Sequence, residues 1–114
     1  MLKYGERYYD EWFGNVYRIL LNDIEIGVVD YEENENELEI NILSFIHGYK
    51  QFSYFEEAVN ILKSMFPGKK LTGLAGPIGC YCGDVKDWEA LGAKTYPDPD
   101  DDIFTIFELE NKEV

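Results

Sequence analysis

Residues 37–66 read ELEINILSFIHGYKQFSYFEEAVNILKSMF, and this stretch decides the fold. Its first third alternates between apolar and polar side chains, which predicts a strand, and the polarity fades toward its end, as in a strand that enters a covered interior. The two predicted strand faces are Leu38, Ile40, Ile42, Ser44 and Ile46 against Glu39, Asn41, Leu43 and Phe45.

The apolar spacing then changes to that of an amphipathic helix, with Phe52, Phe55, Val59, Leu62 and Met65 or Phe66 on the buried side. Ser53 and Glu56 form a capping box that predicts the helix start, and Pro67-Gly68 predicts its end. A helix that follows a strand through a short loop points free N–H groups beyond the strand end, which favours an anion site there.

Composition limits the classes of protein that remain. The 114 residues fit one domain, and 46% hydrophobic content predicts a packed globule. The net charge of −13 opposes direct nucleic acid binding and permits cationic partners, although such acidity more often only keeps a small protein in solution. We find no apolar run long enough for a membrane span and no signal-peptide core, so we expect no membrane contact and a cytoplasmic location.

Upstream of the decisive stretch, we expect an irregular aromatic segment over residues 1–14 and a hairpin that turns at Asn22-Asp23. Downstream, the pattern predicts a strand over 69–74, a helix over 85–91 capped by Asp84 and stopped by Gly92, a loop from Pro97 onward, and a final strand at 102–110. The order is βββ-α-β-α-β. We therefore predict an α+β or α/β three-layer domain with a mixed, mostly antiparallel sheet.

This order resembles the GNAT acyltransferase superfamily. The segments that carry the resemblance are LEINILSFI (38–46), FSYFEEAVNILKSMF (52–66), KKLTGLAG (69–76) and DWEALGAKTY (87–96). The resemblance implies a truncated GNAT-like fold that uses acetyl-CoA or another acyl-CoA to acylate an amine. It also implies a carbonyl-polarising strand bulge near Phe45 and Ile46.

The cofactor loop of that family is rich in glycine, because glycine lets backbone N–H groups approach a pyrophosphate. The matching residues here are His47-Gly48-Tyr49-Lys50-Gln51-Phe52, where Lys50 would offer charge and Phe52 would obstruct. The cofactor-binding residues that the resemblance implies are Phe45, Ile46, His47, Tyr49, Lys50, Gln51, Phe52 and Ser53.

Trp88 stands where family members often carry an acidic tyrosine, and an indole has no ionisable proton for that step. Tyr81, Tyr96 or Cys82 are the substitutes, and Glu39 is the candidate base, unless it is a plain exposed strand residue. Cys80 and Cys82 are expected to be reduced thiols, and with one histidine in the chain no metal site is expected.

Two functions remain open. The first is an acyl-CoA N-acyltransferase whose acidic surface attracts a cationic small-molecule amine or a lysine-bearing peptide. The second is a non-catalytic protein that binds a basic partner protein, for example as a nucleic-acid mimic. In both cases an exposed sheet edge favours a homodimer.

Overall fold

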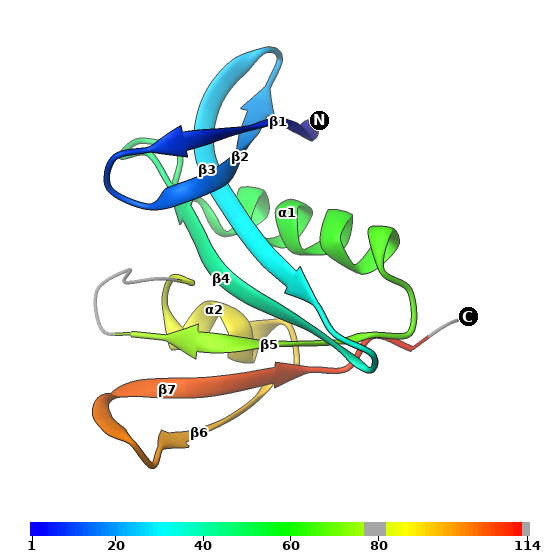
Figure 1. Ribbon diagram of the computed structural model, residues 1–114, viewed down its shortest axis with the longest axis vertical. Coiled ribbons are helices and arrows are strands. Elements are labelled where there is room, and N and C mark those ends of the chain that lie inside the picture. The colour runs from blue at the N-terminus through cyan, green and yellow to red at the C-terminus, as the bar shows by residue number, and fades with distance from the viewer. Residues whose placement is uncertain (77–81, 113–114) are drawn as a thin grey trace.

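The computed structural model describes residues 1–76 and 82–112. One twisted sheet of seven strands has the order β1-β2-β3-β4-β5-β7-β6, and two helices accompany it (Figure 1). The elements are β1 (Leu2–Asp10), β2 (Gly14–Leu21), β3 (Ile24–Glu33), β4 (Glu37–Phe45), α1 (Phe52–Met65), β5 (Lys70–Ala75), α2 (Val85–Ala90), β6 (Lys94–Asp98) and β7 (Asp101–Leu109).

The predicted α/β three-layer, GNAT-like fold is wrong, because the described chain is mostly β with only two short helices. Both helices contribute to one apolar core on the same face of the sheet, as Figure 1 shows, so that core lies between two layers. Two strands were missed. Residues 2–10 form β1, although we expected an irregular segment, and residues 94–98 form β6, although the sequence predicts a loop at Pro97.

The strand β4 also differs from the predicted alternation. The pairing of β3 with β4 shifts between Asp30–Ile42 and Tyr31–Ile40, so Asn41 is an extra residue in a β-bulge. Leu43 therefore joins Leu38 and Ile40 in the main core, while Ile42 packs with Val16 and Val28 in a smaller second cluster. The bulge lies at Asn41, and the expectation of a bulge near Phe45 and Ile46 is wrong.

The helix α1 packs through Phe55, Ala58, Val59 and Leu62, as its spacing predicted. Its first residue, Phe52, is 37% exposed and Met65 is 46% exposed, so neither is a core residue. The predicted capping box is absent, because the N-cap is Gln51 and no side chain caps the helix there.

The C-terminal end of α1 is held from the far end of the chain. The side chain of Asn111, which is the buried polar residue of the described chain, donates to the carbonyl oxygens of Lys63 (3.1 Å) and Phe66 (2.8 Å). These bonds satisfy carbonyls that have no partner within the helix. They fix α1 relative to the sheet, and so they fix the place where α1 begins.

Local turn chemistry agrees with the sequence at three points. Asn22 and Asp23 both have positive φ, as a tight hairpin turn requires. Asp84 caps α2 by accepting from the backbone N–H of Lys86, and Gly92 adopts a left-handed conformation after the helix. Among the described residues, neither helix is long and apolar enough to cross a membrane.

Candidate ligand cleft between two separating strands

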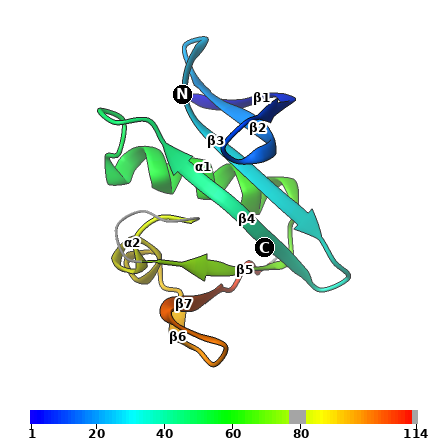
Figure 2. The ribbon, with the colours of Figure 1, turned by 60° about the vertical axis from the view of Figure 1, so that its left-hand side comes forward.

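The candidate site lies where the parallel strands β4 and β5 separate. They are paired from Glu37–Lys70 to Ile40–Gly73. Beyond that point β4 runs on to Phe45 and β5 to Ala75 without pairing to each other. Figure 2 shows the two strands diverging toward α2. The bulge at Asn41 follows directly on Ile40, the last residue of β4 that pairs with β5. The bulge and the strand separation therefore lie at the same opening.

A cavity lies on each side of this opening. The cavity on the helix side has a volume of about 300 Å³, and the one on the open face of the sheet has about 440 Å³. The helix-side cavity is lined by Leu43, Ser44, Phe45, Lys50, Phe55, Gly83, Asp84 and Asp87. The open-face cavity is lined by Glu39, Ile40, Asn41, Thr72, Gly73, Leu74 and Ile106.

A thiol occupies the apex of the opening. The buried Cys82 donates from Sγ to the carbonyl oxygen of Ile40, 3.2 Å away. Burial raises the pKa of this thiol to about 12, with a smaller lowering contribution from a backbone hydrogen bond of Leu74. Cys82 therefore stays protonated at neutral pH and links the two separating strands. This agrees with the expected reduced thiol, while Cys80 lies outside the described residues.

The predicted cofactor residues are only partly brought together. Phe45 and Lys50 line the helix-side cavity. Phe52 leans on Phe55 with ring centroids 6.1 Å apart, and Tyr49 packs beside Tyr54 at 6.3 Å. The remaining predicted residues do not line either cavity, and most of them are exposed: Ile46, His47, Gln51 and Ser53.

The predicted catalytic residues lie on different strands. Glu39 is exposed on β4 and lines the open-face cavity. The hydroxyl of Tyr96, on β6, donates to Glu108 Oε2 at 2.6 Å. That hydrogen bond raises the pKa of Tyr96, so the phenol keeps its proton in the hydrogen bond to Glu108 and is a weaker acid than a free tyrosine. Tyr81 lies outside the described residues.

Trp88 is a core residue. It is fully buried and stacks on Phe107 with ring centroids 3.8 Å apart, and its Nε1–H donates to the carbonyl oxygen of Cys82 at 2.8 Å. Its only polar hydrogen is therefore used within the core. Trp88 stands where the resemblance implied an acidic group, and its role in the structure is to pack α2 on the sheet.

Strand pairing places the side chains of Glu39, Thr72 and Glu108 in one row on the open face, because Glu39 faces Thr72 and Thr72 faces Glu108. Lys70 Nζ lies 3.3 Å from Glu108 and 3.4 Å from Glu37. The hydrogen bond from Tyr96, ahead of that from Lys70, lowers the pKa of Glu108. Glu108 is thus already paired with Lys70 and Tyr96, and Glu39 is the carboxylate of this row that suits a cationic ligand.

Five polar residues that line the two cavities were not among the site residues predicted from the sequence. Asn41 and Thr72 are on the open face, and Ser44, Asp84 and Asp87 line the helix-side cavity with Lys50. Burial, followed by the neighbouring charge of Asp84, raises the pKa of Asp87. The strand pairing that brings Thr72 next to Glu39 has no local signal in the sequence, so no sequence motif identifies these positions.

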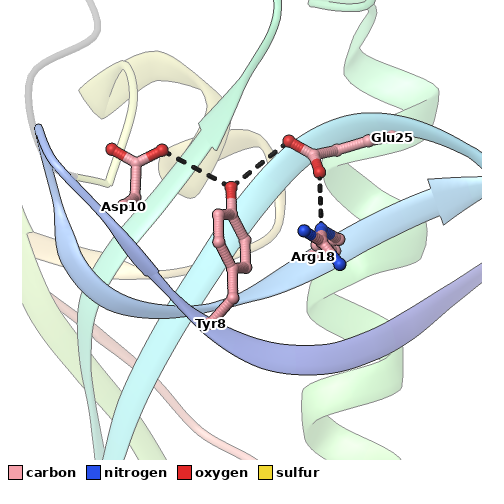
Figure 3. Close-up of polar contacts among 4 residues, drawn as sticks. All are labelled: Tyr8, Asp10, Arg18 and Glu25. Atoms are coloured by element: carbon pink, nitrogen blue, oxygen red, sulfur yellow. Dashed lines mark hydrogen bonds and ion pairs between the residues drawn. The ribbon is translucent and has the colours of Figure 1, made fainter.

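A larger cavity of about 670 Å³ lies over strands β1, β2 and β3, but both of its cations are already paired, Lys3 with Asp23 and Arg18 with Glu25. Figure 3 shows Tyr8 with its hydroxyl 3.4 Å from Asp10 Oδ2 and 3.3 Å from Glu25 Oε2. Arg18 binds Glu25 at 2.8 Å and lies 4.2 Å from the centre of the Tyr8 ring. This cluster holds the hairpin strands together and leaves no free cation for an anionic ligand.

Within residues 1–76 and 82–112, no three His, Cys, Asp or Glu side chains gather in an arrangement that could hold a metal ion. Comparisons of the chain with known protein families, with curated proteins and with solved structures found no match.

Proposed function

We propose that the protein binds an acyl-CoA in the opening between β4 and β5 and transfers the acyl group to a cationic amine. The observation that carries the proposal is the strand separation after Ile40–Gly73, with a bulge at Asn41 and a cavity on each side. A ligand that occupies both cavities would pass between the strands. The proposal rests on this opening and does not depend on the three-layer fold.

The two sides of the opening fit different parts of the reaction. Lys50, beside the start of α1, is the cationic group of the helix-side cavity and would bind phosphate oxygens. The acyl-CoA supplies an activated thioester, and backbone N–H groups of β4 beyond its last pair with β5 would polarise the thioester carbonyl. On the open face, Glu39 would hold the amine and accept a proton from it as the amine attacks.

A second candidate function has its own supporting observation. Cys82 fills the apex of the opening, and Phe52 stands at the helix start where a phosphate would approach. Both features favour a non-catalytic protein that uses its acidic surface to bind a basic protein partner. Under this alternative, Glu39 on the open face binds a lysine or arginine side chain of the partner.

A calorimetric titration with acetyl-CoA separates the two functions. We expect saturable binding in the micromolar range, and we expect Lys50→Glu to weaken it about tenfold or more because a charge-assisted phosphate contact becomes repulsive. Lys63→Glu, in the last turn of α1, is the matched control because it makes the same charge change far from the opening. No binding at millimolar acetyl-CoA, or equal weakening by both variants, overturns the proposal.

Turnover is tested by release of free CoA thiol with spermidine as the acceptor. Glu39→Gln should reduce the rate with spermidine while leaving acetyl-CoA affinity unchanged, since Glu39 lies on the open face and Lys50 on the helix side. Binding of acetyl-CoA without any turnover for a panel of amines would retain the cleft and exclude transfer. The basic-partner function would then be tested with a poly-lysine peptide.

A further inference from the structure

Strand pairing gives the open face an apolar row beside the row that begins at Glu39. Leu74 of β5 faces Ile106 of β7, and Ile106 in turn faces Tyr96 of β6. Neighbouring residues on one face of a strand are about 7 Å apart, so the apolar row lies next to the polar one. Leu74, Ile106 and Glu39 all line the open-face cavity, whose volume of about 440 Å³ lies within the range of small-molecule sites. The cavity thus has a charged end and an apolar wall.

The charged end of the cavity offers two oxygen acceptors. Among the described residues, Glu39 has no hydrogen-bond or ion-pair partner. Asn41 donates from Nδ2 to Asp30 Oδ2 at 3.3 Å, and Asp30 Oδ1 lies 3.2 Å from Arg7 Nη2. Since its amide nitrogen is used in this way, Asn41 has its carbonyl oxygen left for a ligand. An ammonium group has three N–H donors and no acceptor, so it matches a carboxylate together with an amide oxygen.

On the β7 side of the same face, the charges are already paired. Glu108 lies 3.3 Å and Glu37 lies 3.4 Å from Lys70 Nζ. Lys94 faces Glu108 across the pairing of β6 with β7. A second ammonium on this side would therefore approach two lysines, whereas the first meets the unpaired carboxylate of Glu39.

We propose that the amine bound on the open face is a primary aliphatic amine that carries a single positive charge. Its ammonium would lie between Glu39 and the carbonyl oxygen of Asn41, and its hydrocarbon stem would lie on Leu74 and Ile106. The inference rests on the proposed function, since it names the class of amine that this site presents to the thioester. Spermidine, which has several charged nitrogens, would react more slowly than a monoamine, because placing a second charge on the apolar row costs free energy.

Three ligands that share a six-carbon stem test the charge requirement directly. Hexylamine carries one charge, 1,6-diaminohexane carries two and hexanol carries none. Each is titrated into the ¹⁵N-labelled full chain without acyl-CoA, and the backbone amide shifts of Thr72, Leu74 and Ile106 report binding. We expect saturable millimolar binding of hexylamine, at least about fivefold weaker binding of the diamine, and no saturation by hexanol. A salt concentration of about 0.3 M NaCl screens the general attraction of dications to the net charge of −13.

A carboxylate added to the apolar row should change this preference. Ile106→Glu places a second carboxylate at the far end of the stem, so we expect this variant to bind diaminohexane more tightly than hexylamine. Ile103→Glu adds the same charge at an exposed position of β7, where strand alternation points the side chain to the other face of the sheet. This control should leave the order of the two ligands unchanged. Circular dichroism confirms that both variants are folded.

A fourth ligand, Nα-acetyl-lysine methylamide, distinguishes the two sources of such an ammonium group. Binding as tight as that of hexylamine assigns the site to a lysine side chain, and clearly weaker binding assigns it to a free aliphatic amine.

The ligand series on the wild type decides the proposal on its own. Diaminohexane that binds as tightly as hexylamine, or hexylamine that does not saturate, overturns the single-charge site, and so does a folded Ile106→Glu variant that keeps the wild-type preference. Because acyl-CoA is absent from the titration, these results are separate from the fate of the proposed function. A chain that binds hexylamine as expected but does not bind acetyl-CoA keeps the amine site and loses the transfer reaction.

Discussion

At the scale of single residues, the centre of the molecule is an aromatic and sulfur cluster beneath the strand opening. Phe55 meets Trp88 edge to face with centroids 4.9 Å apart, and Trp88 stacks on Phe107. The Trp88 indole then binds the backbone of Cys82, and the Cys82 thiol binds Ile40. This chain of contacts connects α1, α2, β7 and β4, so residues of the core determine the shape of the candidate cleft.

The pKa of Cys82 makes a testable prediction about pH. An unfolded thiol ionises near pH 9, but burial keeps the folded thiol protonated up to about pH 12. The folded state binds the proton more tightly, so the contribution of Cys82 to stability is complete below pH 9 and is lost as pH rises toward 12. Between about pH 8 and about pH 10, the wild type should lose about 1 kcal/mol more unfolding free energy than Cys82→Ala.

Urea denaturation at both pH values, in a Cys80→Ser background, measures this difference. Tyrosines also ionise in alkali, and the comparison with Cys82→Ala subtracts their effect because the variant retains all of them. If the two proteins lose the same free energy between the two pH values, then the thiol is not shielded from solvent as its burial implies.

At the scale of elements, local chemistry predicted the hairpin turn and both helices, although not the cap of α1. The strand pairing was not predicted from the sequence. Asn22-Asp23, Asp84 and Gly92 each act through their own backbone, so the sequence identifies them without knowledge of the fold. Strand β1 carries an irregular mixture of tyrosines and charges, because it is an edge strand with a bulge near Gly5. The bulge at Asn41 depends on the register with β3, and no local pattern encodes that register.

Gly73 shows how closely β4 and β5 approach before they separate. A Cβ at this position would lie 2.8 Å from the carbonyl oxygen of Ile40 and 2.8 Å from Cζ of Phe107. We expect Gly73→Ala to lower the unfolding free energy by about 1 to 3 kcal/mol, because backbone and a buried ring must both move. Chemical denaturation followed by circular dichroism measures the effect.

Gly5→Ala is the matched control for this substitution. The nearest atom to its added Cβ belongs to the Leu20 side chain, at 3.1 Å, and a side chain can rotate away. The control should therefore cost clearly less than Gly73→Ala. Equal costs would mean that the contact between the two parallel strands is not as tight at Gly73 as the structure shows.

At the scale of the whole molecule, the sheet is mixed, but the predicted three-layer arrangement is wrong. Alternating elements suggested helices on both faces, whereas α1 and α2 contribute to a single core on one face. The amphipathic stripe of α1 identifies its buried side without specifying which sheet face receives it. For the same reason the sequence named Glu39 and Lys50 separately, and only the fold places them on opposite sides of one opening.

The net charge of −13 makes the final prediction, which concerns salt. Self-repulsion among carboxylates destabilises the compact state, while the ion pairs here join partly exposed side chains and contribute little. Raising NaCl from about 0.02 M to about 0.5 M screens both effects, and repulsion is the larger, so we expect the thermal midpoint to rise by several degrees. Replacing Asp100 and Asp102 with asparagine reduces the repulsion and should make the rise smaller. A midpoint that falls with added salt would show instead that the ion pairs dominate.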